Sequence, residues 1–172
     1  EIEALCANNS IELLNKQIKE FKPKFVAIGN KDKRGLVKHD RVFCGSQGIE
    51  EMLSLTRSKK VINALVGFSG LRPTRTALKL GKKVALANKE SLVAAGAFVD
   101  MRQISAIDSE HFALSYLIQN RPIKKMYITA SGGAFRDKKP SELKKATLED
   151  ALKHPNWSMG KKITVDRATM MN

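Results

Sequence analysis

Two carboxylates separated by a single residue follow an apolar run in the middle of the chain. Asp108, Ser109, Glu110 and His111 come directly after Ile104–Ile107, which is typical of a strand. Carboxylates spaced in this way at a strand end can share a divalent cation, and oxygen ligands suit Mg2+ or Mn2+. The structural alternative is a helix start, because Asp108 can cap a helix whose positive end also favours Glu110. The spacing alone favours the cap, since Asp-x-Glu is a common pattern.

Further candidate residues follow other apolar runs. Lys89 follows Val84–Ala87 and could pair with an anionic substrate, although a lone lysine is far more often a surface residue. Ser131–Gly133 follows Met126–Thr129 and can bring N–H groups and a hydroxyl to a phosphate, or it can be a plain loop. The segment 154–160, His-Pro-Asn-Trp-Ser-Met-Gly, suits a flap over a small pocket about as well as it suits a core.

Strands and helices alternate along the chain, which predicts an α/β fold with a largely parallel sheet. Because the carboxyl ends of parallel strands form the ligand crevice, we expect the polar groups 88–91, 108–111 and 129–135 to converge. The expected strands are 24–28, 61–66, 84–87, 104–107 and 126–129. The first expected helix is capped by Asn9 and has Ile11, Leu14 and Ile18 on one face. Further helices are expected at 48–55, 73–81 and 92–98, through 114–118, and at 147–153, where Thr147 is the cap.

Composition narrows the class of protein. The 172 residues, 42% of them hydrophobic, allow one ordinary domain or one domain plus a piece of another, and the first residue, Glu1, suggests a segment of something longer. The net charge of +14 comes from lysine doublets spread along the chain without a nucleic-acid motif, which favours a solvated basic surface that attracts small phosphorylated anions. Cys6 and Cys44 lack CxxC spacing, which indicates a reducing compartment and no thiolate zinc site. No window suits a membrane span and no signal peptide opens the chain.

Four segments together resemble the 1-deoxy-D-xylulose 5-phosphate reductoisomerase family in residues, order and spacing. They are Leu86–Val93 (LANKESLV), Ile107–His111 (IDSEH), Ser131–Arg136 (SGGAFR), and 154–160 (HPNWSMG) with its continuation to Asn172 (DRATMMN). The resemblance implies an incomplete Rossmann-like parallel-sheet domain over 1–103, followed by part of an α/β catalytic domain over 104–172. It also implies an NADPH- and divalent-metal-dependent oxidoreductase of non-mevalonate isoprenoid biosynthesis. Such an enzyme rearranges 1-deoxy-D-xylulose 5-phosphate and reduces it to 2-C-methyl-D-erythritol 4-phosphate.

The resemblance also implies partners and roles. It implies NADPH, Mg2+ or Mn2+, a phosphorylated sugar substrate, a homodimer as the complete enzyme, no nucleic-acid or membrane partner, and a bacterial cytoplasmic or plastid stromal location. The implied metal ligands are Asp108 and Glu110, and the implied catalytic residues are Lys89, Glu110 and His154. The implied substrate contacts are Lys89, Ser109, Glu110, Ser131, His154, Trp157, Met159, Arg167 and Asn172. The implied cofactor contacts are Ala7, Asn8, Asn9, Asn88, Glu90 and Gly160.

The chain departs from the family pattern in four places. The glycine-rich GxTGxIG turn that holds the dinucleotide phosphates is missing, and the chain stops at Asn172, before the third carboxylate ligand. Arg167 stands where the family carries a phosphate-binding serine, and Asn8 stands where a basic residue often faces the cofactor's 2′-phosphate. Two alternatives therefore stay open: a folded but inactive fragment that pairs with a partner chain, and a basic nucleic-acid-binding module.

Overall fold

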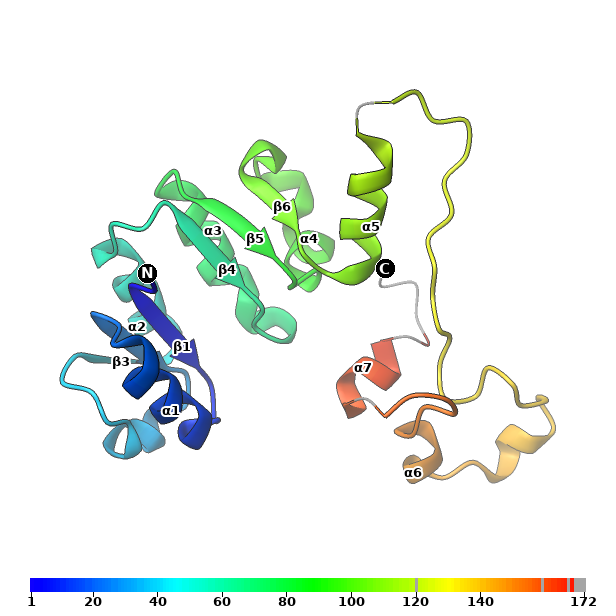
Figure 1. Cartoon of the computed structure of the whole chain (residues 1–172). Helices are drawn as coiled ribbons and strands as arrows, with labels where there is room; N and C mark the ends of the chain where they lie inside the picture. The colour runs from blue at the N-terminus through cyan, green and yellow to red at the C-terminus, as the bar shows by residue number, and fades with distance from the viewer. Residues whose placement is uncertain (120, 159, 167, 169–172) are drawn as a thin grey trace. The chain divides into compact units, whose positions relative to one another are not determined.

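The computed structural model describes residues 1–119, 121–158, 160–166 and 168. The chain divides into two compact units, Glu1–Asp108 and Ser109–Asn172, and each is described by itself (Figure 1). None of the helices within these described residues is long and apolar enough to cross a membrane.

The first unit contains six short strands in two parallel sheets. In the first sheet, β1 (Ala4–Ala7), β2 (Phe25–Ile28) and β3 (Val42–Cys44) are neighbours in that order. In the second sheet the order is β4 (Lys60–Asn63), β5 (Lys83–Leu86) and β6 (Ile104–Ala106). All four strand pairs are parallel, which confirms the predicted α/β class. The strand expected over 61–66 ends at Asn63.

Helices follow most of the strands of this unit. Three of the expected helices form close to the expected positions: α2 (Gly45–Leu55), α3 (Leu71–Lys79), which starts two residues before Pro73, and α4 (Glu90–Ala95). Short 3-10 turns cover Lys31–Leu36, Gly67–Gly70, Gly96–Phe98 and Met101–Gln103.

The predicted cap of the first helix is wrong by one residue. The helix α1 (Ile11–Phe21) has Ser10 at its N-cap, and the Ser10 side chain makes no capping hydrogen bond. The Asn9 side chain instead accepts a hydrogen bond from Asn30 Nδ2 at 3.0 Å through its Oδ1. A contact distant in the sequence therefore displaced a local preference.

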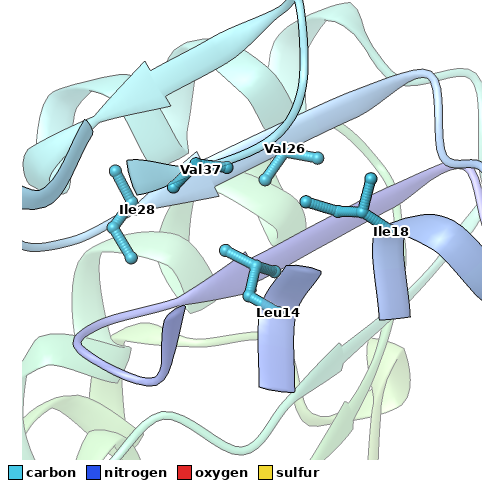
Figure 2. Packing of buried hydrophobic residues seen from close by; sticks show 5 residues of the cluster. All are labelled: Leu14, Ile18, Val26, Ile28 and Val37. Atoms are coloured by element: carbon cyan, nitrogen blue, oxygen red, sulfur yellow. The ribbon is translucent and has the colours of Figure 1, made fainter. Parts of the chain in front are cut away.

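The first sheet is covered on both faces, and β2 is its central strand. On one face, Leu14 and Ile18 of α1 pack against Val26 and Ile28, together with Val37 (Figure 2). The opposite face packs against Ile49, Met52 and Leu53 of α2 through the alternate β2 residues Phe25 and Ala27. Successive strand residues point to opposite faces, so a strand between two helices must be apolar throughout.

The second unit is mainly helical and irregular. It contains α5 (Ser109–Ile118), a 3-10 turn at Glu142–Lys145, α6 (Leu148–Ala151) and α7 (Lys161–Asp166). Thr147 caps α6 as predicted: its side chain accepts from Asp150 N at 3.2 Å, and Asp150 Oδ2 accepts from Thr147 N at 2.9 Å.

The strand predicted at Met126–Thr129 is wrong, because this segment joins no sheet in the described chain. Met126, Tyr127 and Ile128 are 49%, 71% and 49% exposed. A single extended segment leaves its own N–H and C=O groups unpaired, and it becomes a strand only beside another strand.

The Glu3 carboxylate connects the start of β1 to the segment that leads into β4. It accepts hydrogen bonds from Arg57 N at 3.1 Å, Ser58 N at 2.7 Å and Ser58 Oγ at 2.6 Å. The Ser58 hydroxyl, followed by the Arg57 N–H, lowers the pKa of Glu3 to about 2. The buried Lys82 holds the same segment, since its Nζ donates to Thr56 O and Ser58 O, each at 2.8 Å.

We predict that Glu3→Gln lowers the free energy of unfolding by about 1–2 kcal/mol at pH 7, because hydrogen bonds to a charged acceptor are stronger. The folded-state pKa of Glu3 is depressed, so its contribution is fully present above the ordinary pKa of 4.5 and is lost as pH falls through about 2. Urea unfolding should therefore show the difference between wild type and variant shrinking from pH 6 to pH 3. Glu51→Gln, at an exposed position of α2, is the control. An equal loss in both variants would contradict the assignment.

Candidate functional site

The carboxyl ends of β4, β5 and β6 lie side by side at one edge of the second sheet. Ala87 N donates to Asn63 O at 3.0 Å, and Ile107 N donates to Leu86 O at 3.1 Å. The segments that start with Asn88 and Asp108 therefore leave the sheet from neighbouring strands, as predicted. The third polar group, 129–135, belongs to the second unit and does not follow a strand.

Asn88 is a buried residue that organises the loop after β4. Its Nδ2 lies within hydrogen-bond distance of Leu65 O at 2.6 Å, Gly67 O at 2.8 Å and Glu90 Oε2 at 2.9 Å. Its Oδ1 accepts a hydrogen bond from the Ser91 hydroxyl. Because these partners already occupy the side chain, its observed role is to position the loop over the strand ends.

Gly70 makes this arrangement possible. A Cβ at position 70 would overlap the side-chain amide of Asn88. Gly70 O also accepts from Asn63 Nδ2 at 2.9 Å and from Thr74 Oγ1 at 2.9 Å. The loop between β4 and α3 is thus held by two buried asparagines that approach it from adjacent strands.

Ala7, Asn8 and Asn9 form the turn at the carboxyl end of β1. The next strand end holds this turn through Gly29 N to Ala7 O at 2.8 Å and Asn30 N to Asn8 O at 3.1 Å. Lys33 Nζ donates to Asn9 O at 3.3 Å, which brings an ammonium group to the turn. Lys33 belongs to none of the motifs in the sequence; the mostly basic run Lys31–Arg34, shortly after an apolar strand, was the available signal.

In the second unit, the buried His154 orders the His-Pro-Asn-Trp turn. His154 Nδ1 accepts from Asn156 N at 3.2 Å and from Trp157 N at 3.1 Å. A ring nitrogen that accepts N–H groups carries no proton, so these bonds assign the ring proton to Nε2. Nε2 is buried and has no hydrogen-bond partner among the described residues. Trp157 is 59% exposed.

The turn around Ser131 lies against the end of α7. Gly132 has φ +74, and a Cβ at the buried Gly133 would overlap Ala168. Arg136 Nη1 donates to Ser131 O at 2.8 Å. Gly160, at the start of α7, accepts from Thr164 N at 3.0 Å. Met159, Arg167 and Asn172 lie outside the described residues.

The two candidate metal ligands stand on either side of the division between the units. Asp108 ends the first unit, and Glu110 is in the first turn of α5, where its Oε2 accepts from Ser109 Oγ at 2.9 Å. Among the described residues, no group of three or more His, Cys, Asp or Glu side chains could hold a metal ion. Two carboxylates nevertheless fit Mg2+, which keeps several waters and commonly takes one or two carboxylates from the protein. Lys89, half-buried, is the N-cap residue of α4.

Comparison with known proteins decides the family. The model of the 1-deoxy-D-xylulose 5-phosphate reductoisomerase family matches residues 1–96, and the model of the C-terminal domain of that enzyme matches residues 104–172. The chain belongs to this reductoisomerase family. The resemblance seen in the four sequence motifs is therefore confirmed.

Individual members of the reductoisomerase family are similar over nearly the whole chain. The 1-deoxy-D-xylulose 5-phosphate reductoisomerases of Campylobacter jejuni (strain RM1221) and Campylobacter lari are 54% and 56% identical over 172 residues, which is 99% of this chain and 48% of each relative. A crystal structure of a reductoisomerase in complex with NADPH, fosmidomycin and magnesium aligns with a TM-score of 0.80 at 34% identity, over 99% of this chain and 48% of the other. The enzyme from Zymomonas mobilis in complex with NADPH aligns with a TM-score of 0.78 at 32% identity, over 97% and 46%. The chain spans about half the length of the curated relatives it matches.

We predict that Gly70→Ala lowers the free energy of unfolding by about 1–3 kcal/mol, because the added methyl group must displace the buried Asn88 amide. Hydrogen exchange at the amides of residues 65–70 should accelerate as the loop loses its fixed position. Gly96→Ala is the matched control, since its Cβ would meet only Leu92 Cβ at 3.8 Å. Unfolding in urea measures both variants; equal stability of G70A and wild type would contradict the role given to Asn88.

Proposed function

We propose that this chain carries the cofactor-binding region and part of the catalytic region of an NADPH- and divalent-metal-dependent enzyme. The enzyme rearranges and reduces 1-deoxy-D-xylulose 5-phosphate to 2-C-methyl-D-erythritol 4-phosphate. Family membership supports the reaction, and the solved relatives with NADPH, fosmidomycin and magnesium support the cofactors. The observation that carries the proposal is the buried His154 Nε2–H, a donor with no acceptor among the described residues. Such a donor suits an anionic ligand.

The cofactor contacts that we propose lie mostly at strand ends of the first unit. Ala7, Asn8 and Asn9 form the turn after β1, where ligands of parallel α/β sheets bind. Lys33 supplies there the positive charge that a 2′-phosphate needs and that Asn8 lacks. Asn88 and Glu90 hold the loop after β4, and Gly160 remains the contact from the second unit. NADPH, when bound, supplies the hydride.

Asp108 and Glu110 are the proposed ligands of Mg2+ or Mn2+. Their carboxylate oxygens match the preference of both ions. A bound ion would supply Lewis acidity towards the oxygens of the substrate. The chain's own contribution is the placement of Asp108 directly after β6, which sets one carboxylate at the edge where Lys89 and Asn88 also leave the sheet.

The proposed substrate contacts combine positive charge with hydrogen-bond donors. The net charge of +14 favours the approach of a phosphorylated sugar. Lys89 follows β5 and Asp108 follows its neighbour β6, so Lys89 can neutralise negative charge on a substrate bound at that edge. Ser109, Ser131 and His154 donate hydrogen bonds. Lys89, Glu110 and His154 keep the catalytic roles, Trp157 and Met159 cover the substrate, and Arg167 and Asn172 complete the set of contacts.

The complete enzyme is proposed to be a homodimer of the cytoplasm, with no nucleic-acid or membrane partner. The 172 residues alone are proposed to fold without turnover, because they offer two metal carboxylates over about half the length of the relatives. The inactive-fragment alternative therefore assigns the same reaction to the complete enzyme. The plain spread of lysine doublets gives no support to the nucleic-acid alternative.

Asp108→Asn tests the metal site in a full-length context. The neutral amide is a weaker ligand for a hard cation, so we expect Mn2+ affinity and turnover to fall together by at least about tenfold, in line with the effects of altered metal sites. Calorimetry with Mn2+ measures binding, and substrate-dependent oxidation of NADPH measures turnover. Asp137→Asn, at an exposed loop position, is the control. Unchanged Mn2+ affinity and activity at limiting metal would show that Asp108 only caps α5.

Two substitutions at His154 test the roles of its two ring nitrogens separately. Asn places an acceptor near the position of Nδ1 and removes the distal donor, whereas Gln keeps a distal N–H donor and loses the acceptor. We expect His154→Asn to keep most of the stability but to lower kcat/KM by about 10–100-fold, since one hydrogen bond to a charged group is worth about 1.5–3 kcal/mol. His154→Gln should be the less stable variant and the more active one.

Full-length enzyme is again the material, with NADPH oxidation for activity and thermal unfolding for stability. The crossed result, lower stability in one variant and lower activity in the other, supports a substrate contact through Nε2. If both variants lose stability and keep kcat/KM, His154 is a structural residue only.

A further inference from the structure

The segment Ser131–Arg136 folds back on itself, and its last residue closes it. Arg136 N donates to Gly133 O at 3.3 Å, which forms a turn. The Arg136 side chain then reaches back across this turn, and its Nη1 donates to Ser131 O at 2.8 Å. The backbone of Ser131 is therefore held by a guanidinium group that lies five residues further along the chain.

This arrangement needs a glycine in the middle of the segment. Gly132 has φ +74, in the left-handed region that residues with a side chain rarely adopt. A Cβ at this position would also lie only 3.0 Å from both Cβ and Cδ of Arg136. The aliphatic stem of Arg136 therefore covers Gly132 directly, and the lack of a side chain there allows the guanidinium group to reach Ser131.

Packing also fixes the residue that follows Gly132. Gly133 is buried, and a Cβ at this position would overlap Ala168, which comes after α7. Contact with Arg136 at one glycine and with Ala168 at the next restricts the backbone of the turn that carries Ser131.

The Ser131 hydroxyl, by contrast, has hydrogen-bonding capacity left. Its Oγ lies 3.5 Å from Gly132 O, at the limit for a hydrogen bond. A hydroxyl group offers one donor and two acceptor sites, so a loosely bonded hydroxyl on a fixed backbone suits a ligand that supplies an acceptor. A phosphate oxygen is such an acceptor, which is the role proposed above for Ser131.

The charge of Arg136 is already compensated within the same loop. Its Nε forms an ion pair with Asp137 Oδ2 at 3.0 Å. A phosphate that bound this guanidinium group directly would also approach the Asp137 carboxylate, and the two negative charges would repel each other. The geometry therefore favours a role in which Arg136 positions Ser131 over one in which it binds the substrate itself.

We propose that Arg136 is the positioning residue for the Ser131 hydroxyl in the substrate-phosphate site. This inference rests on the proposed function, because it requires that Ser131 contacts the substrate. A planar guanidinium group directs its N–H groups in fixed directions, so Nε can stay with Asp137 while Nη1 holds Ser131 O. A lysine keeps the charge and the aliphatic stem, but an ammonium group on a flexible chain does not reproduce this pair of bonds.

Arg136→Lys in the full-length enzyme tests the inference through the separate values of KM and kcat. The proposed reaction leaves the phosphate group of the sugar intact, so a contact with that group contributes to binding of substrate and transition state alike. We expect KM for 1-deoxy-D-xylulose 5-phosphate to rise about tenfold, because a hydrogen bond to a charged group is displaced, and kcat to change by less than about twofold. Substrate-dependent oxidation of NADPH measures both constants.

Two controls separate positioning from charge. Lys138→Gln removes one positive charge from an exposed position of the same loop, so it should leave KM unchanged. In a Ser131→Ala background, Arg136→Lys should raise KM by less than about twofold, because the hydroxyl that it positions is absent. Thermal unfolding checks that every variant is folded.

Chemical rescue of Arg136→Ala provides an independent readout. This variant lacks both the guanidinium group and its stem, so a small cation added to the solution can take their place. We expect methylguanidinium to lower the KM of this variant severalfold and methylammonium to have no effect, because only the former has the planar donor set. A general loss of structure would not distinguish two cations of equal charge.

Four results would contradict the inference. An unchanged KM in Arg136→Lys overturns it and leaves the proposed function intact. An equal rise of KM in the Ser131→Ala background shows that the guanidinium group contacts the ligand itself, and an equal rise in Lys138→Gln assigns the effect to charge alone. Turnover by the wild type with an unchanged KM in Ser131→Ala removes the Ser131 contact together with the role of Arg136. Absence of turnover by the full-length wild type contradicts the proposed function and, with it, this inference.

Discussion

Burial of parallel strands on both faces is the constraint on which the rest of the first unit depends. β2 satisfies it completely, since all four of its residues are buried between α1 and α2. A strand with no polar face has no room for polar side chains along its length, so polar side chains stand where the strand ends. The candidate residues Asn8, Asn88 and Asp108 all come directly after or within two residues of strand ends.

At those strand ends, buried side-chain amides donate hydrogen bonds to the backbone of the loop. Asn63 and Asn88 approach one loop from β4 and from the end of β5, and their side chains bind Gly70 O, Leu65 O and Gly67 O. Leu65 O and Gly67 O lie beyond the end of β4, and a buried carbonyl group is costly to leave unpaired. The absence of a side chain at Gly70 is the steric condition for this network. Loop shape at this edge is thus decided by packing of polar groups.

How far the sequence predicts this fold follows from the same physics. Strands of continuous apolar residues, such as those at 25–28 and 84–86, are visible without any structure, and so is the Thr147 cap of α6. The strand β3 is three residues long and carries no periodic signal. Asn9 was misplaced because its partner, Asn30, is 21 residues away, and Lys33 was missed because its partner is 24 residues away. Local patterns do not contain such contacts. The family motifs are the basis of the proposed site residues, because the residue types alone did not favour function over cap or loop.

The two units differ in how their buried polar side chains are hydrogen-bonded. In the first unit these side chains position loops, whereas in the second unit one donor remains for a ligand. In the first unit, the buried side chains of Asn63 and Asn88 bind backbone carbonyl groups of the loop after β4, and Lys82 binds carbonyl groups of the segment before it. In the second unit, His154 uses one nitrogen to order its own turn and keeps the other as a buried donor without a partner among the described residues. A buried unsatisfied donor costs about 1–3 kcal/mol in a folded protein. An acceptor supplied by an anionic ligand would remove that cost, so the buried Nε2 donor of His154 is suited to bind an anion.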